Sequence, residues 1–114
     1  MNEENMKLPV VISEVFKALG DPTRLRIIRM LASEMEKDLS VSELAKKLGV
    51  TQPAASQHIK VLKNIGILES KRGGNSVYYN INADVLKQYK ENIDMLFEMA
   101  FKKCRCYGSC NGHE

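Results

Sequence analysis

The sequence predicts a mainly helical α+β domain of about five helices and one two-stranded β-hairpin. Its 114 residues suit one domain, and 44% hydrophobic with 27% charged residues is an ordinary globular balance. Over most of the chain, apolar residues recur every three or four positions, as in amphipathic helices. After Gly66 the period changes to two, which indicates strands.

Several classes of protein are excluded by the same composition. No apolar stretch approaches the roughly 20 residues of a membrane-spanning helix, so we expect no membrane partner. The acidic N-terminus lacks the pattern of a signal peptide, which predicts a cytoplasmic protein. With two His, no Gly-rich phosphate loop and no paired carboxylates beside a nucleophile, we expect no enzyme.

The first two helices are predicted at residues 9–19 and from Pro22 onward. The first carries one apolar stripe, made of Val11, Val15, Phe16 and Leu19. Gly20 ends it, and Asp21 then caps a helix that has Pro22 at its first position. In this second helix we expect Leu25, Ile28 and Leu31 to point inward, and Arg24, Arg26 and Lys37 to stay exposed.

The third and fourth helices form a predicted helix-turn-helix. Ser40 and Glu43 have the spacing of a capping box, in which each side chain satisfies a backbone N–H of the other. Gly49 ends this helix, and Thr51 caps the next, which covers residues 52–64.

The fourth helix has two unlike faces. Ala55, Ile59 and Leu62 form the buried stripe, and the opposite face carries Gln52, Ser56, Gln57, Lys60 and Lys63. Amide and hydroxyl groups can read base edges in a DNA groove, and lysines can meet phosphates. This face has no acidic residue. The chain's excess of basic residues lies in the segment around this helix, since residues 40–82 contain six Lys/Arg and two Asp/Glu. Both features favour DNA binding over an inert solvated helix.

A β-hairpin follows directly. Strands are predicted at residues 67–71 and 77–81, joined by a turn over 72–76, with Lys71 and Arg72 at the tip. A cationic tip can enter a minor groove or lie along phosphates. A helix-turn-helix followed by such a hairpin is a winged helix.

The last helix, predicted at residues 83–103, carries a second apolar stripe. Successive apolar residues of this stripe are separated by 3, 4, 3 and 4 positions, which is the spacing of two heptads. Part of this stripe is able to pack on the domain's own core, but on a domain this small a second apolar stripe favours a dimer interface. Dimerisation also fits DNA binding, because two copies multiply the specificity of a short recognition helix. The candidate interface residues are Val11, Val15, Leu86, Tyr89, Ile93, Leu96 and Phe97.

Several runs resemble the ArsR family of winged-helix repressors. They are residues 16–27 (FKALGDPTRLRI), 41–45 (VSELA) and 51–62 (TQPAASQHIKVL), together with the wing residues Gly74, Val77, Tyr78 and Tyr79. The resemblance covers about residues 10–100. It implies a homodimer formed by the first and last helices, bound to double-stranded operator DNA and released by an inducer or by oxidation of thiols. It also implies DNA contacts from Gln52, Ser56, Gln57, His58 and Arg72.

The metal sites of familiar relatives are not evident in this sequence. Where arsenic-sensing relatives have a Cys-x-Cys pair, this chain has Ser40 and Ser42, whose hydroxyls cannot replace thiolates. The last helix offers Glu91, Asp94 and Glu98 but lacks the His of zinc-sensing relatives.

A different candidate site lies in residues 104–114, predicted to be a flexible tail after a domain of residues 1–103. Three thiolates there suit As(III) or Sb(III), and a nearby His would complete a zinc-type set. Clustered thiols can also act as a redox switch, or do nothing specific. The candidate ligands are Cys104, Cys106, Cys110 and His113.

Overall fold

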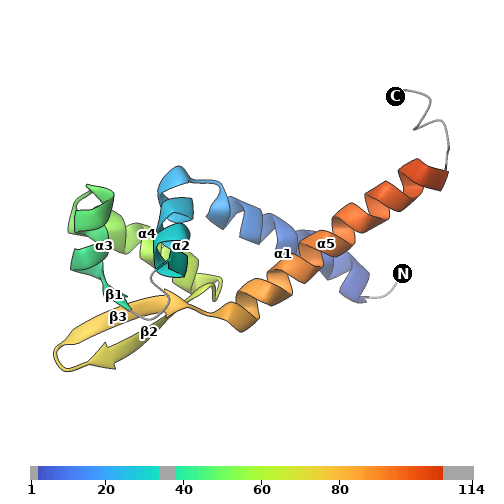
Figure 1. Cartoon of the computed structure of the whole chain (residues 1–114). Coiled ribbons are helices and arrows are strands. Elements are labelled where there is room, and N and C mark those ends of the chain that lie inside the picture. Colours follow the sequence, from blue (N-terminus) through green and yellow to red (C-terminus); the bar gives the residue numbers. More distant parts are fainter. Residues whose placement is uncertain (1–2, 34–37, 107–114) are drawn as a thin grey trace.

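The computed structural model describes residues 3–33 and 38–106. Within these residues it contains five helices and a three-stranded antiparallel sheet (Figure 1). The winged helix predicted from the sequence is therefore confirmed. In chain order the elements are α1 (Glu3–Leu19), α2 (Pro22–Ser33), β1 (Leu39–Ser40), α3 (Val41–Leu48), α4 (Gln52–Asn64), β2 (Leu68–Gly73), β3 (Ser76–Ile81) and α5 (Ala83–Cys106).

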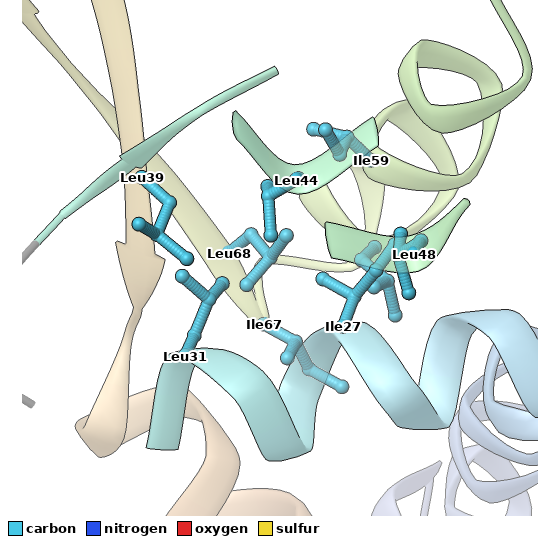
Figure 2. Close-up of a cluster of buried hydrophobic side chains, with 9 residues drawn as sticks. Ile27, Leu31, Leu39, Leu44, Leu48, Ile59, Ile67 and Leu68 are labelled. Atoms are coloured by element: carbon cyan, nitrogen blue, oxygen red, sulfur yellow. The ribbon is translucent and has the colours of Figure 1, made fainter. Parts of the chain in front are cut away.

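The hydrophobic core joins α2, α3 and α4 to the base of the hairpin. Figure 2 shows buried side chains from these elements converging on one another. Ile27 and Leu44 are fully buried at its centre. Burying a side chain of this size contributes roughly 1.5–3 kcal/mol, so this cluster holds the helix-turn-helix together. Its members are Ile27, Leu31, Leu39, Leu44, Leu48, Ile59, Leu62, Ile67 and Leu68.

The phase of α2 differs from the prediction at one position. Leu25 is 50% exposed, whereas Ile27 is fully buried. Prediction from spacing alone grouped Leu25 with Ile28 and Leu31. In the fold, Ile27 and Leu31, one helical turn apart, form the buried pair.

Two helix boundaries lie outside their predicted limits. α1 begins at Glu3 and includes Pro9, which was predicted to mark the helix start. Pro9 is exposed, and its ring removes one backbone N–H from the hydrogen bonds of the helix. α5 continues beyond Lys103 to Cys106.

The sheet contains one strand more than the hairpin predicted from the sequence. β1 pairs with β3 through Leu39↔Tyr79 and Ser40↔Tyr78, so the strand order is β1-β3-β2. A two-residue strand has too few residues to show a period. Pairing with β3 places Ser40 where it also caps α3.

The hairpin turn is tighter than predicted. Arg72 pairs with Val77 and Gly73 with Ser76, which leaves only Gly74 and Asn75 in the turn. Gly74 has φ +63°, and no non-glycine residue described has a positive φ. A positive φ at the first of two turn residues suits a II′ hairpin, whose twist matches that of its strands.

Helices α1 and α5 pack against each other and extend away from α3 and the hairpin (Figure 1). We call these two helices the arm. At its base, the Tyr89 hydroxyl donates a hydrogen bond to the carbonyl oxygen of Ile65, just after α4. The Asn82 side chain accepts from the backbone N–H of Val85 and so caps α5. The arm is therefore anchored directly to the helix-turn-helix.

Candidate nucleic-acid interface

The connection between α3 and α4 is fixed by local hydrogen bonds. Gly49 adopts a left-handed conformation with φ +73°, and its N–H donates to carbonyl oxygens at the end of α3. The Thr51 hydroxyl accepts from the backbone N–H of Ala54 at 3.2 Å, which caps α4. At the start of α3, Ser40 and Glu43 form both bonds of the capping box, at 3.2 and 2.9 Å. These caps were predicted from the sequence and are confirmed.

The two faces of α4 also lie as predicted. Ala55, Ile59 and Leu62 are buried. The five polar residues of the opposite side are exposed, and we call this set the reading face: Gln52, Ser56, Gln57, Lys60 and Lys63. Because α4 contains no acidic residue and its two lysines lie in the second half, the helix offers amides first and positive charges beyond them. Such a face suits base edges with phosphates alongside.

His58 has a different environment from the reading face. It is half-buried, and its Nδ1 lies 3.3 Å from Nη1 of Arg24 on α2. Arg24 was predicted to be solvated, yet it is half-buried and also donates to two carbonyl oxygens of α1. Sequence patterns could not reveal this contact, because the two residues are 34 positions apart.

The hairpin presents its two cations differently. Lys71 and Arg72 are both exposed on β2, where they pair with Tyr78 and Val77. Neighbouring residues on a strand point to opposite faces, so one approach of DNA cannot engage both side chains equally. The turn itself is formed by Gly74 and Asn75, and both cations lie in the strand before it.

The residues predicted for a dimer interface fall into two groups. Val15 is 2% exposed and thus already buried within the chain, while Leu86 and Tyr89 pack against the core and Ile93 is half-buried. The others are exposed: Val11 at 38%, Leu96 at 40% and Phe97 at 52%.

The arm exposes further large apolar side chains that the prediction did not assign to an interface. We call the exposed apolar set the arm surface; on α1 and α5 it consists of Val10, Val11, Phe16, Met95, Leu96, Phe97, Met99 and Phe101. Beside it, α1 and α5 enclose a groove of about 170 Å³, with Val15 and Leu86 in its wall. Lys90 and Asp94 form an ion pair at 2.8 Å beside this groove.

The predicted metal ligands lie at or beyond the end of the described chain. Cys104 and Cys106 belong to the end of α5, and Cys110 and His113 lie outside the described residues. Over residues 3–33 and 38–106, no group of three His, Cys, Asp or Glu could hold a metal ion. The metal site therefore stays a prediction. No helix in the same part of the chain is long and apolar enough to cross a membrane.

Comparison with known proteins points in one direction. Residues 21–70 match the model of a family described as bacterial regulatory protein, arsR family. The cadmium resistance transcriptional regulatory protein CadC homolog of Staphylococcus aureus is 36% identical over 73% of this chain and 67% of its own length. The transcriptional repressor SdpR of Bacillus subtilis is 32% identical over 67% of this chain and 81% of its own length.

A solved structure extends the likeness to three dimensions. It is the homodimeric winged helix-turn-helix DNA-binding domain of a possible ArsR-family regulator from Mycobacterium bovis. The TM-score is 0.66 at 26% identity, over 86% of this chain and 88% of the other. The described relatives are regulators of transcription rather than enzymes.

Proposed function

Because the chain belongs to the ArsR family of bacterial regulatory proteins, we propose that it is a homodimeric repressor that binds operator DNA through α4. The observation that carries this proposal is the reading face, which is exposed, free of acidic residues and held by a capped turn. Gln52, Ser56 and Gln57 would meet base edges in the major groove, and Lys60 and Lys63 the phosphates.

The hairpin supplies the second contact in this proposal. With α4 in the major groove, Arg72 would lie over the adjacent minor groove, where its charge meets a strong negative potential. Since Lys71 points to the other face of β2, we assign it to the neighbouring phosphate backbone or to solvent.

The arm surface supports the proposed homodimer. Five large apolar side chains are exposed on the second half of α5 alone, and burying them requires a second surface. A two-fold dimer would place two copies of α4 about one DNA turn, roughly 34–36 Å, apart. The similar domain from Mycobacterium bovis is itself described as homodimeric.

For the inducing signal we propose a thiophilic metal or metalloid at Cys104, Cys106 and Cys110, with His113 as a further ligand. The alternative is a thiol-redox switch or a signal independent of metal.

The first experiment selects double-stranded DNA from a random pool with the reduced protein and measures the stoichiometry of the complex. We expect an enriched sequence with two half-sites, bound by two chains. Absence of any enriched sequence would contradict the proposed operator binding. Binding of one chain per DNA site would contradict the proposed homodimer but not the proposed operator binding.

A second experiment titrates the DNA complex with arsenite and then with zinc, and follows thiolate absorption and DNA release together. The matched control changes Cys104, Cys106 and Cys110 to Ser. We expect this variant to bind DNA normally and to lose release by the ion. If neither ion binds while DNA binding persists, the metal proposal is wrong, and titration with oxidants tests the redox alternative.

A further inference from the structure

The Arg24 side chain lies where three helices meet. Arg24 is in the first turn of α2, and its Nε donates to the carbonyl oxygen of Ala18, while Nη2 donates to that of Lys17 at 3.3 Å. Both carbonyls belong to the last turn of α1, where a helix has acceptors without intrahelical partners. One guanidinium therefore completes the end of α1 and joins it to α2.

The same guanidinium reaches the recognition helix. Its Nη1 lies 3.3 Å from Nδ1 of His58 on α4. A guanidinium can only donate, so Nδ1 of His58 must accept, and the neutral imidazole then carries its proton on Nε2. His58 follows Gln57 of the reading face directly. The contact thus ties the orientation of α4 to the ends of α1 and α2.

We propose that Arg24 is a positioning residue for DNA recognition, which acts by holding His58 on α4 against the junction of α1 and α2. This proposal rests on the proposed operator binding. It gives His58 the role of hydrogen-bond acceptor within the protein. It also connects the arm to the reading face, because α1 belongs to both the arm and the Arg24 junction.

Asp21 supports the same arrangement. Its Oδ1 accepts from the backbone N–H groups of Thr23 and Arg24, at 2.8 and 3.3 Å. Burial raises the pKa of this carboxyl, but the two backbone hydrogen bonds and the positive charge of Arg24 outweigh burial, so the pKa lies below its ordinary value. A negative charge consequently stays beside the Arg24 side chain.

The first test is Arg24→Lys, which keeps the positive charge but replaces a planar fork by a single ammonium. A single ammonium nitrogen cannot occupy the three separate positions of Nε, Nη1 and Nη2. We therefore expect affinity for the selected DNA to fall about tenfold, equivalent to ~1.4 kcal/mol. The salt dependence of binding should stay unchanged, because the charge is kept. Unchanged affinity would overturn the proposal.

Arg26→Lys is the matched control, since Arg26 is exposed on the same helix. We expect this variant to bind DNA as the wild type does. Thermal unfolding of both variants, measured in parallel, identifies any loss of folded protein. If Arg26→Lys lowers affinity as much as Arg24→Lys, the effect belongs to α2 as a whole, and the positioning role of Arg24 is refuted.

A second pair of variants tests the atom through which His58 acts. Asn can place an acceptor near the position of Nδ1, whereas the longer Gln side chain reaches toward that of Nε2. We expect His58→Asn to bind within about twofold of wild type and His58→Gln to lose about tenfold. The reverse order would assign His58 to DNA through Nε2. That order, or equal affinity of the two variants, would overturn the proposal.

Combining Arg24→Lys with His58→Gln completes the argument. If both residues act through one contact, the double variant should lose no more affinity than either single variant. Additive losses would contradict the shared contact. Failure of the wild type to bind any selected DNA would instead refute operator binding itself, so the two proposals fail by different results.

Discussion

The helix-turn-helix and the arm differ in how far their apolar side chains are buried within the chain. α2, α3 and α4 bury theirs in a core shared with the hairpin, and the outer side of α4 is polar. In the arm, α1 buries Ile12 and Val15, whereas the second half of α5 exposes Phe, Met and Leu side chains. The proposed DNA-reading part therefore has its buried core within one chain, whereas in the proposed homodimer the exposed side chains of the arm are buried against the partner.

The largest expected effect concerns the core of the reading part. Leu44→Ala removes a fully buried side chain where three elements meet and should destabilise the fold by about 2–5 kcal/mol. Chemical denaturation followed by circular dichroism measures this loss. A cost well under 1 kcal/mol would mean that the core has room to collapse around the cavity, unlike the close packing described above.

The second prediction concerns the arm. Phe97→Ser should barely change the stability of the monomer, because the side chain is 52% exposed, but should raise the dimer dissociation constant about tenfold or more. Analytical ultracentrifugation measures the constant. Leu25→Ser is the control, since Leu25 is equally exposed at 50% but lies on α2. Equal weakening by both variants would show that the interface is not confined to the arm.

A smaller effect is expected at the first cap of the helix-turn-helix. Ser40→Ala removes the oxygen that accepts from the Glu43 backbone N–H, which should cost roughly 1 kcal/mol. Ser40→Thr retains a capping hydroxyl and should lose much less. The two unfolding midpoints decide the matter: if they coincide, the capping box does not stabilise this helix.

The smallest effect is a pH dependence at Asp21. In the folded protein the pKa of Asp21 lies below its value in the unfolded chain. The ionised carboxylate therefore stabilises the fold above the unfolded pKa, and this stabilisation is lost as pH falls through the folded pKa. As pH falls from about 5 to about 3, the unfolding temperature of the wild type should decrease more than that of Asp21→Asn, because Asn can cap the helix but does not ionise. Parallel curves for the two proteins would contradict this role of the carboxylate.

Local signals in the sequence were sufficient for the caps and the two faces of α4. The capping hydrogen bonds of Ser40, Gly49 and Thr51 join residues no more than four positions apart. They can therefore be predicted without knowledge of the tertiary structure. The period of α4 likewise identified the reading face. Both features depend on spacing along one segment.

Features that depend on distant contacts could not be predicted in this way. Ile27 rather than Leu25 faces the core because of how α2 docks on the other elements. β1 exists only through its pairing with β3. The contact of Arg24 with His58 joins two helices across the fold, and no pattern near either residue announces it.

The central claim, that the reading face of α4 binds DNA, is tested most directly by the salt dependence of binding. The variant Lys60→Gln/Lys63→Gln is compared with Lys87→Gln, an exposed lysine on α5. If both lysines meet phosphates, the double variant weakens binding to all sequences and lowers the slope by about two per chain, while Lys87→Gln matches the wild type. A double variant with the affinity and slope of the wild type would contradict the account.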